Sequence, residues 1–377
     1  MKADIINIGL NNNHQNNQLI INKMRKTLTF ILLSFITLSS YGQRKIVRLP
    51  DLPGYVTLKC DFHTHTVFSD ANVWPTARID EALRDGLDAL AITDHLEYTP
   101  HKDFVPADFN AAWKIGESYA KERNLILVHG AEITRKMPPG HVNALFITDA
   151  SLLAQDSVWD CYEAAIKQGA FLLWNHPGWK AQQPDMIPRM YEIHEKLLKK
   201  GWLHGIEFFN DNEYYPLVFK FCQKYNLAIM GNSDVHGVIS EIYRSPEYTN
   251  RPMTLVFAKE RTSDALKEAM FAGRTMVYFR DILAGKEEYA KPFFYQCIKV
   301  GKPYYENEKN LYFEVTNNSD VPFYLINGVP DAPASITLAA NSVTRVVVSK
   351  KVTKPLVYDV RNVITGETDV LKIELKY

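Results

Sequence analysis

Two histidines separated by a single residue stand near the start of the globular part of the sequence. His63 and His65 follow the run 56–62, in which apolar side chains occupy every second position. On a β-strand this alternation places the apolar side chains on one face, and Asp61, His63 and His65 on the other. Two imidazoles so placed can bind one metal ion, and Asp61 could orient one of them. Alone, the pair would rather indicate a polar strand end at the surface.

Further histidine and carboxylate side chains follow other short apolar runs along the chain, where strands are expected to end. In a parallel barrel the carboxyl ends of all strands lie on one face, and that face carries the chemistry. We therefore expect one bowl-shaped site that binds several metal ions. The candidate ligands are His63, His65, Asp70, His95, Glu132, His141, His176, Asp234 and His236.

The other histidines serve as a control. Six of the eleven histidines fit this bowl, and the remaining five lie in the leader, in loops or helices, or out of phase with a strand end. We expect these five to be surface or structural residues: His14, His101, His129, His194 and His204.

The elements that must position the site alternate between about residues 50 and 285. The strand-like runs are 56–62, 87–93, 125–128, 144–147, 171–174, 205–209, 227–230, 253–258 and 275–279. The helical stretches are 76–84, 107–123, 158–168, 187–200, 216–225 and 263–272. This alternation predicts a parallel sheet, and the number of repeats favours a closed barrel over an open doubly wound sheet. No glycine-rich phosphate loop follows a strand, which argues against a nucleotide-binding fold.

From about residue 290 the pattern changes to short β-rich runs. These runs are 293–300, 311–315, 321–326, 335–338, 344–348, 355–360 and 370–375, and turn residues separate them. There is neither a helical period nor a histidine. We predict an α/β barrel domain over 50–286 and a small β-sandwich over 290–377, which serves packing or dimerisation rather than carbohydrate binding.

The N-terminus resembles a secretory signal. Met24-Arg25-Lys26 precedes the apolar run 28–38 and small residues before Gln43. That run is shorter than the roughly 20 residues of a membrane-spanning helix. We expect a misassigned leader over 1–23 and a signal peptide over 24–42, so that the mature protein is exported to the periplasm or secreted. The alternative is a soluble leader followed by a buried strand.

The composition is that of a globular protein. The 377 residues are 46% hydrophobic and 23% charged, with a formal net charge of +0, so no nucleic-acid partner and no stable membrane insertion of the mature chain are indicated. The oligomeric state does not follow from the sequence. The cysteines are too widely spaced for a disulfide framework, and we expect four buried thiols: Cys60, Cys161, Cys222 and Cys297.

Taken together, the motifs resemble one family. In type and order they are similar to those of the polymerase-and-histidinol-phosphatase (PHP) phosphoesterases over residues 55 to 285: Asp61-Phe62-His63-Thr64-His65, Ser69-Asp70, Thr93-Asp94-His95, Glu132, His141, Asn175-His176-Pro177 and Ser233-Asp234-Val235-His236. The resemblance implies a distorted (β/α)7 barrel and two or three divalent metal ions, which in this family are Zn, Mn or Fe. The C-terminal β-rich region is similar to exported members with phosphodiesterase or phosphotriesterase activity.

The resemblance also implies how the ligands are shared. The first ion would be held by His63, His65, Glu132 and Asp234; Glu132 would bridge to a second ion held by His141 and His176; and a third would be held by Asp70, His95 and His236. Many members carry histidine where this chain has Asp70, and the carboxylate favours a harder ion at that position.

The implied reaction is hydrolysis of a small-molecule phosphate ester, either a diester or a monoester, by a hydroxide that bridges the first two ions. Three ions against three carboxylates leave a local charge of about +3, which suits a phosphate. Asp94 or His236 could transfer a proton to the leaving oxygen. Arg135 could contact a substrate oxygen or could simply be a solvated loop charge. An enzyme that cleaves monoesters usually holds the dianion with several basic residues, and few lie near these motifs, which favours a diester.

Aromatic residues near the motifs could frame an organic leaving group or could pack in the wall of the barrel: Phe68, Trp74, Tyr98, Trp174 and Trp179. Two other functions remain open. One is a metal-dependent hydrolase of C–N or carboxylic ester bonds, because a bridging hydroxide serves those reactions too. The other is a non-catalytic metal-dependent binding protein, against which the complete ligand set argues.

Overall fold

The computed structural model describes residues 45–377 except 107, 244–249, 327 and 354. The predicted leader and signal peptide, residues 1–42, lie outside the described residues. Residues Ile46–Tyr377 form one compact unit. Within the described ranges, every helix is too short or too polar to cross a bilayer.

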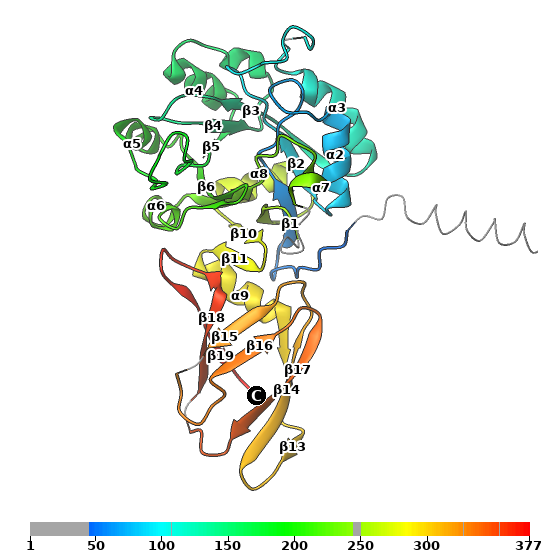
Figure 1. Cartoon of the computed structure of the whole chain (residues 1–377), viewed down its shortest axis with the longest axis vertical. Coiled ribbons are helices and arrows are strands. Elements are labelled where there is room, and N and C mark those ends of the chain that lie inside the picture. The colour runs from blue at the N-terminus through cyan, green and yellow to red at the C-terminus, as the bar shows by residue number, and fades with distance from the viewer. Residues whose placement is uncertain (1–44, 107, 244–249, 327, 354) are drawn as a thin grey trace, which may run out of the picture. The chain divides into compact units, whose positions relative to one another are not determined.

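A mixed β-sheet curls into a barrel in the first part of this unit (Figure 1). Its strands follow the order β9-β1-β2-β3-β4-β5-β6, and β8 pairs with β6. The bounds are β1 Val56–Asp61, β2 Ala89–Ile92, β3 Ile126–Ile133, β4 Val142–Leu145, β5 Phe171–Trp174, β6 Gly205–Asn210, β8 Ala228–Asn232 and β9 Met253–Ala258. The short β7, Glu213–Tyr214, forms a hairpin with β6.

Amphipathic helices surround the barrel (Figure 1). They are α2 Pro75–Arg84, α3 Ala111–Glu122, α4 Val158–Lys167, α5 Glu192–Lys199, α6 Val218–Tyr225 and α8 Ser263–Phe271, and shorter turns form η1 Ala150–Leu153 and α7 Ile239–Ile242. Each of the nine predicted strand runs overlaps an observed strand, and each of the six predicted helical stretches overlaps an observed helix. The predicted α/β barrel is confirmed.

The strands are not all parallel, which corrects the sequence prediction. β1, β2 and β3 are parallel, as are β5, β6 and β8, but β4 runs antiparallel to both of its neighbours and β9 runs antiparallel to β1. The barrel closes irregularly between β8 and β1. There, Thr64 and Val235 form an isolated parallel bridge, and the backbone N–H of Phe62 donates to Asn232 Oδ1 at 2.9 Å.

The C-terminal part is an antiparallel β domain of two sheets, as predicted. One sheet contains β12 Ile298–Val300, β13 Tyr305–Glu306, β14 Asn310–Asn317 and β17 Ser342–Ser349, and the other contains β15 Phe323–Ile326, β16 Ser335–Leu338, β18 Leu356–Ile364 and β19 Val370–Leu375. The second sheet continues into the barrel sheet through the hairpin of β10 Thr275–Phe279 and β11 Ile282–Gly285, because β11 pairs in parallel with β18.

One predicted β run is wrong. Residues 293–297 belong to helix α9, Glu287–Cys297, and only 298–300 form a strand. Phe293, Phe294 and Cys297 are fully buried. They share one helical face, because Cys297 lies four residues after Phe293 and three after Phe294. The aromatic residues of this stretch resemble a β composition, and Pro292 just before it disfavours a helix interior, so the short helical period was masked.

Candidate metal centre

All nine predicted ligands meet in one cluster. Their nitrogen and carboxylate oxygen atoms form four overlapping groups, in each of which the atoms lie within 4.8 Å of one another. The groups are His65, Asp70, His95 and His236; His63, His65 and Asp234; His63, Glu132 and His176; and His95, Glu132 and His141. No other residue in the described part of the chain joins such a group.

The barrel topology explains why residues so distant in sequence converge. Most candidate ligands follow the carboxyl ends of the parallel strands β1, β2, β5 and β8, and Glu132 lies within β3 near its end. His141 instead precedes β4. Because β4 is antiparallel to its neighbours, the start of β4 lies at the same edge of the barrel as their ends. The antiparallel strand therefore brings His141 into the site.

The first group centres on Asp234. Asp234 Oδ1 lies 3.1 Å from His63 Nε2 and 3.0 Å from His65 Nε2. Glu132 Oε1 is 3.4 Å from His63 Nε2. His63, His65 and Asp234 therefore face a common position, and Glu132 contacts this group through His63 but belongs to two other groups.

Glu132 stands between the groups, as expected for a bridging carboxylate. Its Oε1 lies 3.1 Å from His141 Nδ1 and 3.7 Å from His176 Nε2. Its Oε2 lies 2.5 Å from His95 Nδ1, although the sequence analysis placed His95 only with the third ion. In the structure, His95 thus lies between two of the groups.

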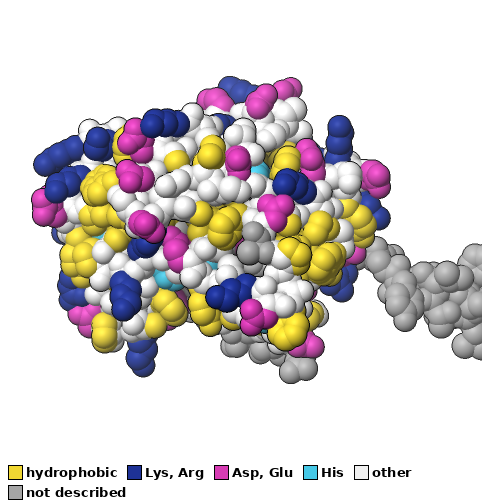
Figure 2. Space-filling view, turned by 90° about the horizontal axis from the view of Figure 1, so that it is seen from above, with side chains coloured by type: hydrophobic (Ala, Val, Ile, Leu, Met, Phe, Trp, Pro, Cys, Tyr) yellow, Lys and Arg dark blue, Asp and Glu magenta, His cyan; other side chains and the backbone are white. Residues whose placement is uncertain are grey.

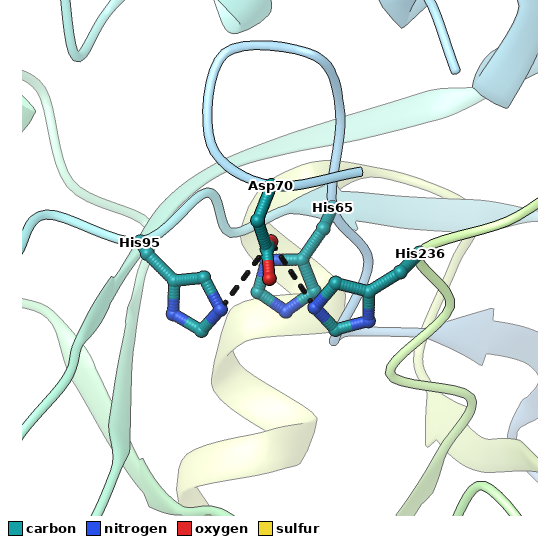
Figure 3. Close-up of side chains that lie close together, drawn as sticks. All are labelled: His65, Asp70, His95 and His236. Atoms are coloured by element: carbon teal, nitrogen blue, oxygen red, sulfur yellow. Dashed lines mark ion pairs between the residues drawn. The ribbon is translucent and has the colours of Figure 1, made fainter. Parts of the chain in front are cut away.

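The third group is built around Asp70 (Figure 3). Asp70 Oδ1 lies 3.2 Å from His236 Nε2 and 3.5 Å from His95 Nε2, and the His65 ring lies beside them. The Nδ1 of His236 is 2.8 Å from the Asp234 carbonyl oxygen, so it donates there and leaves Nε2 free to face Asp70.

Several buried polar atoms in the cluster form no well-oriented hydrogen bond among the described residues, although oppositely charged ligand atoms lie near them. They are His63 Nε2, both ring nitrogens of His65, Glu132 Oε2 and Asp234 Oδ1. An unsatisfied buried donor or acceptor costs roughly 1–3 kcal/mol, so such atoms are rarely left together without a ligand. Imidazole nitrogens and carboxylate oxygens are suitable ligands for Zn, Mn or Fe. The residues present therefore fit divalent metal ions.

Comparison with a solved structure agrees with this geometry. A two-domain protein from Bacteroides vulgatus that contains a predicted PHP-like metal-dependent phosphoesterase is 39% identical, with a TM-score of 0.85 over 89% of this chain and 99% of that one. This chain belongs to the PHP-like metal-dependent phosphoesterase family. A family profile described as an Ig-like domain matches residues 298–376.

Two other comparisons are more limited. The uncharacterized protein MJ1295 of Methanocaldococcus jannaschii is 32% identical over 82 residues, so the match spans 22% of this chain and only 36% of that relative. PsfC from Pseudomonas syringae covers 59% of this chain and 91% of its own, with 19% identity and a TM-score of 0.39, which is too distant to support an argument.

Glu207 on β6 is a residue of this PHP-like site that the sequence analysis missed. Its carboxylate is fully buried and accepts hydrogen bonds from His63 Nδ1 at 2.9 Å and the His176 backbone N–H at 2.7 Å. The side-chain amides of Asn210 and Asn232 donate to it at 2.8 and 2.9 Å. Glu207 therefore fixes the His63 tautomer and turns Nε2 into the cluster. A lone acidic residue inside the apolar run 205–209 was the signal in the sequence.

Asp61 does not orient an imidazole, contrary to the sequence prediction. Strand β1 ends at Asp61, so the alternation does not continue through His63 and His65. The Asp61 carboxylate instead accepts from the Ser233 backbone N–H at 3.1 Å and from its hydroxyl at 2.5 Å, and pairs with the buried Arg251 at 3.0 Å. Asp61 thus holds the chain that leads into Asp234.

Asp94 is also placed differently from the prediction. Its carboxylate accepts from the backbone N–H and hydroxyl of Thr66, both at 2.6 Å, and from the Ser69 hydroxyl at 2.8 Å. Burial raises the pKa of Asp94 above its usual value, and the hydrogen bonds from Thr66 and Ser69 offset only part of this rise. With both oxygens occupied, Asp94 positions the loop that carries Asp70, and this placement does not support proton transfer.

The Arg135 guanidinium likewise points away from the cluster. It donates to the Gln155 carbonyl at 2.6 Å and pairs with Glu97 at 3.0 Å. The prediction that Arg135 contacts substrate is therefore not supported by the structure.

Arg78 on α2 is a second residue that the sequence did not indicate. This fully buried guanidinium donates to the His65 carbonyl at 3.0 and 3.1 Å and to the Gly237 carbonyl at 3.0 Å. It also pairs with Glu81 at 2.5 Å. Arg78 therefore ties two ligand-bearing loops to one helix.

Two candidate ligands have unusual backbone conformations. His176 and Asp234 have φ angles of +25° and +51°. Positive φ is rare for residues with a side chain, and such conformations cluster at functional sites because the surrounding structure must hold them. The Glu207 bond to the His176 backbone N–H is one such restraint.

The buried ligands shift one another's pKa: burial opposes protonation of His95, but the carboxylates of Glu132, Asp70 and Asp234 raise its pKa to about 9, whereas the pKa of His65 is lowered. Burial and repulsion from His95 and His236 lower the pKa of His65 to about 3, so its imidazole is neutral and able to bind a metal. Burial alone would raise the pKa of Glu132, but the surrounding histidines hold it well below its usual value. The carboxylate is therefore ionised.

A pocket of about 370 Å³ opens onto the cluster. Six candidate ligands line it: Asp70, His95, His141, His176, Asp234 and His236. Six further residues complete the lining: Tyr98, Thr134, Trp179, Asn210, Asp211 and Glu213. Figure 2 views the molecule from above and shows histidine atoms in small openings between acidic and hydrophobic side chains. No described lysine or arginine lines the pocket.

The predicted aromatic residues divide between pocket and wall. Tyr98 and Trp179 line the pocket. Trp174 is fully buried and stacks on His194 with 4.0 Å between ring centroids, so it is wall packing. Phe68 and Trp74 pair with each other at 5.6 Å and do not line the pocket.

The control residues behave as expected wherever the structure describes them. His101, His129, His194 and His204 lie outside all four ligand groups, and His129 stacks on Trp113 at 4.6 Å. The four cysteines are free and buried, as predicted.

Proposed function

We propose that this chain is an exported hydrolase that uses two or three divalent ions, Zn, Mn or Fe, to cleave small-molecule phosphodiesters. The observation that carries the proposal is the convergence of nine ligand side chains, several with buried atoms that form no well-oriented hydrogen bond among the described residues, beneath one pocket. Export rests on the signal-like sequence 24–42 alone.

The chain's own residues set the geometry of the reaction. When bound, divalent ions would polarise the phosphoryl oxygens and supply an ionised water as nucleophile at neutral pH. Glu132 lies between the ligand groups, and Asp70 and His236 belong to one group and both line the pocket. Of the two predicted proton carriers, only His236 lines the pocket, and its side chain is 36% exposed. His236 is therefore the proposed proton donor to the leaving oxygen in a two-ion form, in which its Nε2 binds no metal, because its Nδ1 already donates to the Asp234 carbonyl oxygen.

A diester fits this pocket better than a monoester. A monoester dianion is usually held by several basic side chains, and the described lining contains none. Counting the buried Glu207, which the sequence analysis did not include, four carboxylates against three divalent ions leave about +2. This smaller charge suits a monoanionic diester.

The proposal is tested by metal analysis and paired assays. Purified protein should contain Zn, Mn or Fe and should hydrolyse methyl p-nitrophenyl phosphate faster than p-nitrophenyl phosphate. We expect Glu132→Ala to lose metal and turnover, whereas Glu192→Gln, on the exposed side of α5, should keep both. Full activity of chelated, metal-free protein would contradict the proposal. Faster cleavage of a p-nitrophenyl carboxylic ester or an anilide would favour a carboxylic ester or C–N hydrolase instead.

A further inference from the structure

Two carboxylates in the pocket lining belong to none of the ligand groups. Asp211 follows β6, and Glu213 begins β7, so both lie on one hairpin. The Tyr243 hydroxyl donates to Asp211 Oδ1 at 3.2 Å, and the Tyr215 hydroxyl donates to the Glu213 carboxylate. These bonds hold both carboxylates in place at the pocket.

No described lysine or arginine neutralises this pair. Neither Asp211 nor Glu213 forms an ion pair within the described residues, whereas Asp185, Glu192 and Glu287 each pair with a basic residue four positions along the chain. Asp211 is half-buried, so its charge is less screened than that of a fully solvated acid. The pocket therefore carries the two negative charges of Asp211 and Glu213 in addition to those of the candidate metal ligands.

Two aromatic surfaces face the same pocket. The Tyr98 and Trp179 side chains line it, and these residues remain 54% and 38% exposed. The Trp179 ring lies 5.2 Å from the His176 ring, and the Tyr98 ring lies 6.0 Å from the His95 ring, measured between centroids. Both aromatic rings therefore lie within reach of a group attached to a phosphate at the candidate metal positions.

Carboxylates beside a phosphate site are unfavourable for a substrate whose only charge is the phosphate. They become favourable when the substrate also carries a positive charge. Aromatic faces together with carboxylates are the combination that proteins use to bind alkylammonium groups, through cation–π attraction and ion pairing. A neutral polyol could also stack on Trp179 and donate to Asp211, but it would leave both carboxylate charges uncompensated.

We propose that Asp211, Glu213, Trp179 and Tyr98 recognise an alkylammonium group, so that the preferred substrate is a zwitterionic phosphodiester with one ester arm ending in an ammonium or quaternary ammonium. This inference rests on the proposed function, because the phosphate of that diester occupies the candidate metal centre.

The test compares substrates that differ only in charge. Metal-loaded protein is assayed with p-nitrophenyl phosphorylcholine, with its uncharged isostere p-nitrophenyl 3,3-dimethylbutyl phosphate, and with the p-nitrophenyl diester of glycerol phosphate. We expect kcat/KM for the choline ester to exceed that of the isostere by about tenfold or more, with the preference shrinking as salt is added. Equal values for the choline ester and the isostere, or a preference for the glycerol diester, would overturn the inference.

Variants assign the preference to the named residues. Asp211→Asn and Glu213→Gln, singly and together, should bring the ratio of kcat/KM for choline ester to isostere toward one, and Glu192→Gln should keep the wild-type ratio. The ratio corrects for any general loss of activity. Metal content is measured in each variant: loss of an ion from Asp211→Asn would show that this carboxylate is a ligand and would overturn the inference.

A binding measurement separates this inference from the proposed function. If no diester is hydrolysed by metal-loaded protein, the proposed function fails. Calorimetric titration with phosphocholine and with 3,3-dimethylbutyl phosphate still decides the inference. Tighter binding of phosphocholine, weakened in Asp211→Asn, supports it, and equal binding overturns it.

Discussion

Glu207 illustrates how one buried carboxylate controls an imidazole that follows another strand. It accepts from His63 Nδ1 and from the His176 backbone, so it acts on two candidate ligands at once. Asp94 and Asp61 act similarly on loops rather than on rings. At the scale of single residues, the site thus consists of ligands and of a layer of carboxylates that hold them.

Removing the charge of Glu207 should weaken metal binding. Glu207→Gln cannot accept from His63 Nδ1 as strongly, and loss of such an orienting partner typically reduces metal affinity about 10–100-fold. Calorimetric titration of Zn into apoprotein measures the change, with Glu192→Gln as the matched control. An unchanged Zn affinity in Glu207→Gln would contradict the role of Glu207 in orienting His63.

A substitution at Asp94 should distinguish positioning from proton transfer. We expect Asp94→Asn to lower kcat, because an amide cannot accept all the bonds from Thr66 and Ser69 that hold the Asp70 loop. The pH–rate profile should keep both of its limbs. Loss of one limb in Asp94→Asn would restore the proton-transfer role.

Secondary structure elements place the ligands by direction as well as by order. His141 reaches the site only because β4 runs opposite to its neighbours. Helix α2 contributes no ligand, yet its Arg78 joins the loops of His65 and Gly237. Elements outside the motifs therefore determine whether the motifs meet.

Breaking the Arg78 contacts should destabilise the protein. Arg78→Met leaves Glu81 and several carbonyls buried without their donor, and such a loss costs about 3–5 kcal/mol. Denaturant unfolding measures the free energy, and Arg123→Met, at an arginine whose side chain is 37% exposed, serves as the control. A loss of unfolding free energy below about 1 kcal/mol in Arg78→Met would show that the Arg78 contacts are dispensable for stability.

At the scale of the whole molecule, the barrel and the β domain share structure. Strand β11 pairs with β18, and Phe294 of α9 packs on Phe323 of β15 with 4.8 Å between ring centroids. One buried apolar cluster includes residues of both parts. The β domain thus covers apolar surface of the barrel, which agrees with the packing role expected from the sequence.

Deleting the β domain should impair the barrel. A chain ending at residue 286 would expose the apolar side of the cluster that contains Leu283 and would leave the β11 edge unpaired. We expect aggregation or a lower melting temperature than that of the longer chain, measured by light scattering and thermal unfolding. A monomeric, fully active truncated barrel would contradict this expectation.

Acid should destabilise the fold through buried histidines outside the site. Burial lowers the pKa of His129, His194 and His204 from 6.5 to about 4. Between these values the unfolded chain binds protons that the folded protein does not, so stability falls as pH decreases from 6.5 toward 4, by at most about 1.4 kcal/mol per pH unit for each histidine. Urea unfolding at pH 5 and pH 7 should show this loss. His129→Gln should reduce this loss of stability. An unchanged pH dependence in that variant would show that His129 does not contribute to the loss.

The sequence by itself determined the order of elements, the two-part organisation and the nine ligand candidates, because strand and helix periods and polar strand ends are local patterns. It did not identify Glu207, Arg78 or the antiparallel direction of β4. These depend on which residues meet across the barrel, and a buried charge acquires its role only from partners more than a hundred positions away, as Glu207 does from His63. Tertiary structure also decided against Asp94 and Arg135, since their neighbours in space, rather than their proximity to a motif, fix where they point.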